Sequence, residues 1–237
     1  MKLETQCLHA GYSPESTTNA CAVPLYKTSS FVFNDTEHAA NLFGLRELGN
    51  IYTRLMNPTT DVLEQRVAAM EGGAAGLGIA SGTSAVFYSI INLAQEGDEI
   101  VSANNLYGGT YTQFNDILPK FGIKVKFVDP NNPANFAAAI TDKTKALFCE
   151  SVSNPGLDVA DIKAIANVAD DHGIPLIVDS TFSTPYLTNP IEHGASIVIH
   201  SLTKWMGGHG NGIGGIVVDS GTFNWKNGNF PLYDNPD

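Results

Sequence analysis

The chain has 237 residues, enough for one large domain with a well-buried core, or for such a domain with an additional arm. Hydrophobic residues make up 43% and charged residues 16%, which excludes a disordered chain. The 24 acidic residues outnumber the 13 basic ones, and the formal charge of −11 argues against nucleic acid and anionic membranes as partners. Any phosphate that binds must therefore be held by local donors.

Cysteine usage indicates a reducing, cytoplasmic compartment. The number of cysteines is odd, and Cys7, Cys21 and Cys149 show no C-x-x-C spacing, so neither a disulfide framework nor a zinc site is expected. Cys149 lies in an apolar run and is interpreted as a core residue. The N-terminus lacks the apolar region of a signal peptide, and no stretch reaches the length of a membrane span.

Residues 1 to about 60 show no sustained periodicity and are rich in Thr, Ser, Asn and Pro. This composition predicts an extended arm that packs on something else. The pattern changes at Asp61, because apolar residues recur at helical spacing from Asp61 to Glu71. We therefore expect a helix there, at the start of a globular domain.

Beyond this helix, short apolar runs alternate with helical patterns as far as Val218. The predicted strands are residues 77–80, 99–103, 124–128, 146–150, 175–179, 197–200 and 215–218. The clearest helix runs from Val159 to His172 and ends at Gly173. Such alternation predicts an α/β fold with a mostly parallel sheet, whose ligand lies beyond the carboxyl ends of the strands. Residues 224–237 are aperiodic, and no closing element is expected there.

The residues that follow four of these strands are chemically distinctive. Asp179 ends one strand, Lys204 follows another, and Asn154 follows a third. Ser81-Gly82-Thr83 comes after the first strand and opens a helix. Because the carboxyl ends of parallel strands meet at one edge of a sheet, these residues are expected to share one site.

A pyridine aldehyde cofactor needs the chemistry that these residues offer. Lys204 supplies an amine for an imine, and Asp179 supplies a carboxylate that keeps the ring nitrogen protonated. The helix start at residues 81–83 offers N–H donors to a phosphate, and Gly82 lets the backbone approach closely. Ser201 and Thr203 add hydroxyls on one face if the segment is extended.

Each feature also has an ordinary explanation. A lone lysine is usually a solvated cation, an Asp after a strand is usually a turn residue, and Ser-Gly-Thr is often only a helix cap. The run from Gly210 to Gly215 matches G-x-G-x-x-G but leads into a strand, which argues against a dinucleotide site. The histidines lack metal-ligand spacing, and there is no G-x-S-x-G motif. The combination at successive strand ends favours the pyridoxal phosphate (PLP) interpretation.

The segment from Ser201 to Lys204, followed by Gly207 to Gly210 and Ile213 to Gly215, resembles the Cys/Met-metabolism family of PLP enzymes. Further landmarks occur in order along the chain: residues 9–12, 23–26, 57–59, 71–73, 107–110, 150–155 and 178–182. The resemblance implies fold type I, an aspartate-aminotransferase-like PLP domain at residues 61–237 with an N-terminal arm at residues 1–60. Family members continue into a C-terminal domain that binds the substrate carboxylate, and we expect that domain to be absent from this chain.

The resemblance also implies roles for individual residues. Lys204 would be the Schiff-base lysine and proton shuttle, and Asp179 would pair with the ring nitrogen. Tyr107 would stack on the ring, Asn154 would bond its hydroxyl, and Thr181 would join this cofactor site. The phosphate would be held by Ser81, Gly82, Thr83, Ser201 and Thr203.

Two residues of the arm, Tyr52 and Arg54, match a Tyr-x-Arg that in this family reaches the phosphate of the neighbouring subunit. The resemblance therefore implies a dimer for function, and a homotetramer is expected. The arm's lack of an obvious packing partner in its own chain agrees with this expectation.

Within the family, Gly49 to Arg54 with Met56 to Thr59 is similar to the O-acetylhomoserine sulfhydrylase branch. This similarity implies γ-replacement on O-acetylhomoserine with sulfide or a thiol, giving homocysteine or methionine and acetate. Cystathionine γ-synthase, cystathionine γ-lyase or methionine γ-lyase activity is the alternative. An alternative of another class is an inactive PLP-binding fragment or interaction module.

Two positions depart from the family pattern without removing a role. They are Ser180, where the family often has Asn, and Asn211-Gly212.

Overall fold

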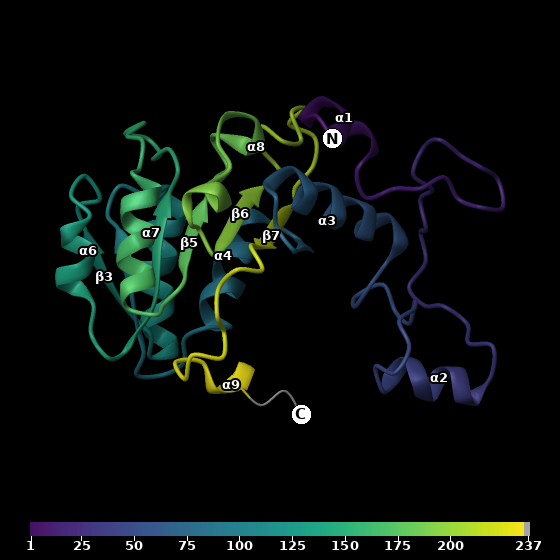
Figure 1. The fold of residues 1–237 in the computed structure, drawn as a ribbon, viewed down its shortest axis with the longest axis horizontal. Helices are drawn as coiled ribbons and strands as arrows, with labels where there is room; N and C mark the ends of the chain where they lie inside the picture. The colour runs from purple at the N-terminus through teal and green to yellow at the C-terminus, as the bar shows by residue number, and fades with distance from the viewer. Residues whose placement is uncertain (235–237) are drawn as a thin grey trace.

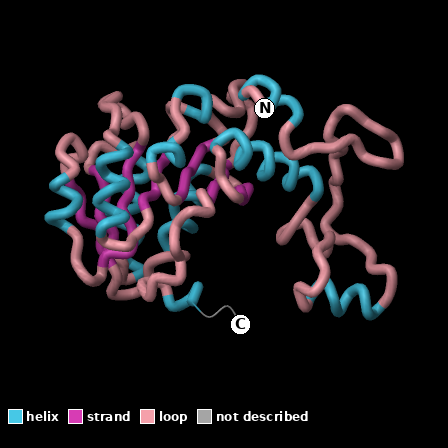
Figure 2. Tube along the Cα trace, in the orientation of Figure 1, coloured by secondary structure: helices cyan, strands magenta, loops and turns pink. Residues whose placement is uncertain are grey.

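The computed structural model describes residues 1–234. Its body is a seven-stranded sheet with helices on both faces, and an N-terminal segment extends away from that body (Figures 1 and 2). The strands are β1 (Ala75–Ile79), β2 (Glu99–Ala103), β3 (Lys124–Val128), β4 (Thr144–Glu150), β5 (Leu176–Asp179), β6 (Ile197–Ser201) and β7 (Gly215–Asp219). All seven predicted strands are present.

The sheet has the strand order β1-β7-β6-β5-β4-β2-β3. Strand β7 is antiparallel to both β1 and β6, and every other pairing is parallel. The predicted α/β fold with a mostly parallel sheet is therefore confirmed. The carboxyl ends of β4, β5 and β6 lie side by side, since Glu150 pairs with Asp179 and Asp179 pairs with Ile199.

Helices cover the sheet and complete the core. The helical segments are α1 (Leu3–His9), α2 (Thr36–Phe43), α3 (Pro58–Glu71), α4 (Gly82–Ile91), α5 (Gly108–Thr112), η1 (Gln113–Ile117), η2 (Leu118–Phe121), α6 (Ala134–Ala139), α7 (Ile162–Asp171), α8 (Thr184–Leu187), η3 (Pro190–His193) and α9 (Pro231–Asp234). Helix α7 packs against β4 and β5, and α4 packs against β6 and β7. Cys149 lies in the core as predicted, and burial raises the pKa of its thiol to about 12.

The helix predicted from Val159 to His172 begins later than expected. Helix α7 starts at Ile162, because the Asp161 side chain accepts a hydrogen bond from the Ala164 N–H at 3.0 Å and caps the helix. Val159 instead forms an isolated β-bridge with Val152 and is 78% exposed. Its apolar side chain fits the helical spacing by coincidence, so the predicted boundary is wrong by one turn.

The start of the arm does have a packing partner in its own chain. Helix α1 packs against α3, and the Arg66 side chain donates a hydrogen bond to the Ala10 carbonyl at 2.9 Å. The following segment, residues 12–57, leaves the body and carries α2 at its far end (Figure 1). It presents exposed apolar side chains: Leu25, Val32, Phe43, Leu45, Leu48 and Leu55. Part of this segment also contacts α3, because the Thr59 hydroxyl donates to the Pro24 carbonyl at 2.8 Å and accepts the Tyr26 N–H at 2.9 Å. The expectation that the arm lacks a packing partner in its own chain is therefore wrong for α1 and for residues 24–26.

The C-terminal segment is more ordered than its aperiodic sequence suggests. The rings of Phe223, Trp225, Phe230 and Tyr233 form a cluster, with centroids 4.7 Å apart for the first pair and 5.2 Å apart for Trp225 and Tyr233. Lys145 lies over the Phe230 ring at 5.9 Å. These contacts hold residues 223–233 against the body, while residues 235–237 of the predicted domain lie outside the described residues.

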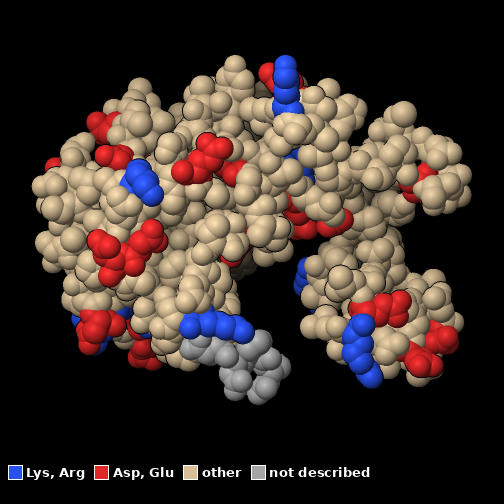
Figure 3. Space-filling view, viewed as in Figure 1, with Lys and Arg blue, Asp and Glu red and all other residues tan. Residues whose placement is uncertain are grey.

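On the face shown in Figure 3, acidic side chains are spread over the body, with few basic ones among them. This distribution agrees with the formal charge of −11. Among the helices of residues 1–234, none combines the length and the apolar character needed to cross a membrane.

Candidate active site

A cavity of about 590 Å³ lies at the carboxyl ends of β4, β5 and β6, beside the start of α4. Its volume falls within the range of small-molecule sites in proteins. Most of the residues predicted to bind a cofactor line this one cavity: Ser81, Gly82, Thr83, Tyr107, Asn154, Asp179, Thr181, Ser201, Thr203 and Lys204. The fold thus brings together side chains that are up to 123 positions apart, from Ser81 to Lys204.

Lys204 lies in a tight turn three residues after β6, with its side chain exposed at the cavity. The Lys204 N–H donates to the Ser201 carbonyl at 3.2 Å, and the Gly208 N–H donates to the Lys204 carbonyl at 2.9 Å. A Cβ atom at Gly207 would collide with the Leu202 carbonyl oxygen, so the turn needs glycine there. The turn places Lys204 in the cavity that Asp179 and Ser201, at the ends of β5 and β6, also line.

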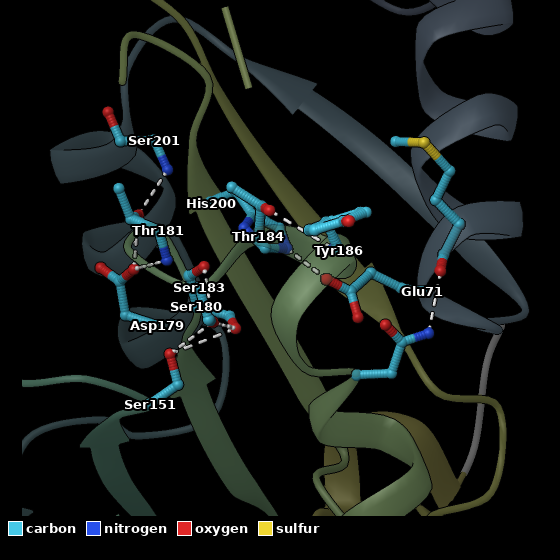
Figure 4. Close-up of polar contacts among 12 residues, drawn as sticks. Glu71, Ser151, Asp179, Ser180, Thr181, Ser183, Thr184, Tyr186, His200 and Ser201 are labelled. Atoms are coloured by element: carbon cyan, nitrogen blue, oxygen red, sulfur yellow. Dashed lines mark hydrogen bonds and ion pairs between the residues drawn. The ribbon is translucent and has the colours of Figure 1, made fainter. Parts of the chain in front are cut away.

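Asp179 is oriented by its neighbour Thr181 (Figure 4). Asp179 Oδ1 accepts hydrogen bonds from the Thr181 N–H at 3.0 Å and the Thr181 hydroxyl at 2.6 Å. Thr181 Oγ1 in turn accepts the Ser201 N–H at 2.8 Å, which ties the end of β5 to β6. Within residues 1–234, Oδ2 makes no hydrogen bond and can take a donor from a ligand. Burial raises the pKa of Asp179, while the Thr181 bonds and nearby His200 oppose the rise.

The start of α4 forms the opposite wall of the cavity. Ser81 caps this helix, since its hydroxyl accepts the Ser84 N–H at 3.1 Å. The next amides, those of Gly82 and Thr83, have no acceptor inside the helix and can bind an anion. A Cβ atom at Gly82 would lie 2.6 Å from that of Ser201, so only glycine lets α4 approach β6 this closely. Ser81 is thus a helix cap, as the ordinary explanation of this motif has it, and it also lines the cavity.

The Thr203 hydroxyl is engaged with the glycine-rich loop. It accepts the Gly214 N–H at 3.1 Å and lies 3.3 Å from the Gly214 carbonyl. Its predicted contact with a phosphate would therefore compete with this local pairing. Among the described residues the Ser201 hydroxyl has no hydrogen-bond partner and is available to a ligand, since the bond to Thr181 uses the Ser201 N–H.

Glu150, the last residue of β4, is a site residue to which the sequence analysis assigns no role. Its Oε1 accepts the Tyr107 N–H at 2.6 Å, and its Oε2 accepts the Asn154 N–H at 3.0 Å. Burial, with a smaller effect from the charge of Asp179, raises the pKa of Glu150 to about 7 against these two hydrogen bonds. Glu150, like Asp179, is a carboxylate at the carboxyl end of a parallel strand, so the reasoning that selects Asp179 from the sequence selects Glu150 equally well.

Two buried polar groupings lie close to the ends of β5 and β6 (Figure 4). The hydroxyls of Ser151, Ser180 and Ser183 are mutually hydrogen-bonded at 2.6 to 3.3 Å. His200 Nε2 lies 2.5 Å from Glu71 Oε1, and both side chains are fully buried. The pair of Glu71 and His200 joins the end of α3 to β6, the strand that leads to Lys204.

Tyr52 and Arg54 are not among the residues that line the cavity. They lie on the arm, where the Arg54 guanidinium sits 4.9 Å from the centre of the Tyr52 ring. A single chain therefore does not bring them to its own site. Within residues 1–234, no three His, Cys, Asp or Glu side chains gather as a metal-binding group.

The chemical groups that the cavity presents match those that PLP needs. An exposed amine, a carboxylate with an available oxygen and the amide groups of a helix start meet the three needs of the aldehyde, the ring nitrogen and the phosphate. The tyrosine ring at the mouth, which is 48% exposed, offers a flat face to a bound ring.

Comparisons with known proteins give a consistent result. A family model described as Cys/Met metabolism PLP-dependent enzyme matches residues 4–233. O-acetyl-L-homoserine sulfhydrylase of Leptospira meyeri is 57% identical over 236 residues, covering 100% of this chain and 53% of that protein. Homocysteine synthase of Schizosaccharomyces pombe is 52% identical, covering 98% of this chain and 55% of that protein. The chain thus spans about half the length of the curated relatives it matches.

Solved structures agree in fold. A Campylobacter jejuni protein assigned as an O-acetylhomoserine (thiol)-lyase superposes with a TM-score of 0.92 at 41% identity, covering 94% of this chain and 55% of that one. That structure contains an N'-pyridoxyl-lysine-5'-monophosphate. Cystathionine γ-lyase from Lactobacillus plantarum, in complex with L-serine, superposes with a TM-score of 0.85 at 38% identity, covering 93% of this chain and 55% of that one.

Proposed function

Because this chain belongs to the Cys/Met metabolism family of PLP-dependent enzymes, we propose that its cavity holds PLP for γ-replacement on O-acetylhomoserine. One observation carries the proposal: Lys204, Asp179 and the start of α4 converge on a single cavity of about 590 Å³. The products are homocysteine and acetate when sulfide is the donor, and methionine when methanethiol is the donor.

The residues divide the work between holding the cofactor and moving protons. When bound, PLP supplies an aldehyde that captures amines and a ring that withdraws electrons. Lys204 would hold the cofactor through its amine and would move the proton at the substrate Cα. Asp179 would keep a proton on the ring nitrogen, and the Gly82 and Thr83 amides would hold the phosphate.

The proposed reaction replaces one substituent at Cγ of the substrate. The bond between Cγ and the ester oxygen of O-acetylhomoserine breaks, acetate leaves, and a C–S bond forms at the same carbon. Relatives named sulfhydrylases, sulfhydrylase-like proteins or homocysteine synthases are 45% to 57% identical, whereas the cystathionine γ-lyase structure is 38% identical. This difference favours γ-replacement over the cystathionine and methionine γ-lyase activities.

We also propose that the site is completed in a dimer, in which the arm carries Tyr52 and Arg54 to the phosphate of the neighbouring subunit. The exposed apolar side chains between Leu25 and Leu55 support this proposal, because a second chain would remove them from water. A tetramer is the proposed assembly of two such dimers.

The first test is the visible absorption spectrum of the protein with PLP, before and after O-acetylhomoserine. We expect a band from covalently held cofactor that shifts with substrate, and Lys204→Ala should abolish both the band and homocysteine formation. Lys163→Ala, on the exposed face of α7, is the matched control and should change neither. An unchanged band in Lys204→Ala would contradict the role of this lysine, and a keto acid and ammonia in place of homocysteine would contradict γ-replacement.

A further inference from the structure

The side chain of Glu150 bridges two loops that border the cavity. It stands at the end of β4, is 7% exposed, and lines the cavity beside Asp179. One carboxylate oxygen binds the N–H of Tyr107, at the start of α5, at 2.6 Å. The other binds the N–H of Asn154, in the loop after β4, at 3.0 Å. One carboxylate therefore joins residues that are 47 positions apart.

Those two residues carry the side chains expected to contact the ring of the cofactor. Tyr107 and Asn154 both line the cavity, and each is anchored through its own backbone N–H rather than through its side chain. A shift of either backbone would move the attached side chain relative to Lys204 and Asp179. Small displacements of this kind weaken a site, because binding groups need to be held to about half an ångström.

We propose that Glu150 is a positioning residue that sets the placement of the Tyr107 ring and the Asn154 side chain around bound PLP. The inference rests on the proposed function, because it assumes that the cavity takes the cofactor. A carboxylate is the group that this task needs, since each of its two oxygens can accept one N–H. The isosteric Gln side chain offers one oxygen and would turn an N–H donor toward the second amide.

The buried charge of Glu150 lowers the stability of the folded protein, and packing alone would not require a charge there. The ionisable groups that share cavities with Glu150 are Tyr107, Asp179 and Lys204 on one side and Cys149 and Asp158 on the other. Burial and the neighbouring Asp179 raise the pKa of Glu150 to about 7. Burial makes the ionised carboxylate costly, and filling this space does not require a charge, which is the pattern expected when a charged group is kept for function.

Glu150→Gln in the full chain tests the inference through three measurements at pH 8. We expect hydrogen exchange at the Tyr107 or Asn154 amide, measured without cofactor, to accelerate about tenfold or more after loss of a charge-assisted hydrogen bond. The dissociation constant for PLP should rise about tenfold. The denaturant midpoint should stay equal or rise, whereas a purely structural role would lower it.

Glu64→Gln is the matched control. Glu64 is also a partly buried carboxylate with a raised pKa, and it accepts the Gly78 N–H at 2.7 Å, but it does not line the cavity. The control should alter exchange at Gly78 alone and leave PLP affinity unchanged.

The two proposals fail in different ways. If the unaltered chain does not bind PLP, the proposed function is overturned, and the inference falls with it. If the unaltered chain binds PLP and Glu150→Gln binds it equally tightly, the inference alone is overturned, whether or not the two amides exchange faster. Weaker PLP binding in Glu150→Gln with unchanged exchange at both amides would also overturn it, because the effect would then not pass through Tyr107 or Asn154.

Discussion

Two carboxylates at neighbouring strand ends differ in the oxygens that they leave available to a ligand. Asp179 uses one oxygen to bind Thr181 and keeps the other available to a ligand, whereas Glu150 has both oxygens occupied by backbone N–H groups. Burial raises the pKa of both groups. The difference in available oxygens supports Asp179 as the group that contacts the cofactor and Glu150 as the group that holds the surrounding loops.

The raised pKa of Glu150 predicts a specific dependence of stability on pH. Its pKa is about 7 in the folded protein and 4.5 ordinarily, so the folded state binds this proton more tightly. The contribution of Glu150 to stability is complete below about pH 4.5 and is lost as pH rises through about 7. Glu150→Gln should therefore gain stability over the unaltered protein at pH 8, by up to about 3 kcal/mol, and little at pH 4.5.

Urea unfolding of both proteins between pH 4.5 and pH 8 measures this difference. Glu15→Gln is the control, because the Thr17 and Thr18 hydrogen bonds lower the pKa of Glu15 to about 2. Glu15 is ionised throughout this range in the folded protein, and its substitution should leave the curve above pH 6 parallel to the original. A difference between Glu150→Gln and the unaltered protein that does not vary with pH would contradict the prediction.

At the scale of elements, the buried pair of Glu71 and His200 joins α3 to β6. Both side chains are fully buried, and Glu71 Oε2 and His200 Nδ1 have no partner within residues 1–234. Such a pair adds little net stability while intact, but removal of one member leaves a polar group buried without compensation. The pair therefore fixes where α3 meets the strand that leads to Lys204.

Glu71→Ala should reduce the free energy of unfolding by about 3 to 5 kcal/mol, because it orphans the buried His200 ring. Glu99→Ala provides a comparison, since Glu99 lies 2.6 Å from Lys126 but both side chains keep some exposure, at 11% and 35%. Loss of that pair, together with the hydrogen bond that Glu99 accepts from the Thr141 hydroxyl at 2.8 Å, should cost only about 1 to 2 kcal/mol. Equal losses in the two variants, measured by urea unfolding, would contradict the assigned importance of burial.

At the scale of the whole molecule, the arm and the cavity belong to different parts of the chain. The cavity lies in the body, whereas residues 12–57 extend away from it and carry Tyr52 and Arg54 (Figure 1). Several large apolar side chains on this segment are exposed to solvent in a single chain: Leu25, Val32, Phe43, Leu45, Leu48 and Leu55. Both observations are explained if two chains exchange arms, so that each site is built from two subunits.

Mixed dimers of Lys204→Ala and Arg54→Ala chains test this arrangement. Each variant alone should form little homocysteine, since every site lacks either the lysine or the arginine. After unfolding and refolding together, one site of each mixed dimer would have both residues, and about one quarter of the unaltered activity should return with random pairing. No recovery after mixing, with dimers present by light scattering, would contradict the shared site.

The local sequence pattern was sufficient to predict the strands of the sheet and the candidate site residues at their carboxyl ends. The predicted strand at residues 99–103 coincides with β2, whose residues are all buried, because a parallel strand covered on both faces favours a short, mostly apolar run. Asp179 and Lys204 follow such runs, and parallel pairing leads their strands to the same edge. Position in the chain and elementary geometry are therefore enough to place both residues near one site.

The remaining features depend on partners that are distant in the chain. Glu71 meets His200 across 129 positions, and Glu150 meets Tyr107 across 43, so neither contact has a local signal. Val159 is the opposite case, a local signal without the matching structure. Its spacing in the sequence is helical, but the helix begins only after the cap at Asp161. Periodicity reports which face of an element is buried, whereas hydrogen-bond partners are chosen by the packing of whole elements, and that choice exists only in three dimensions.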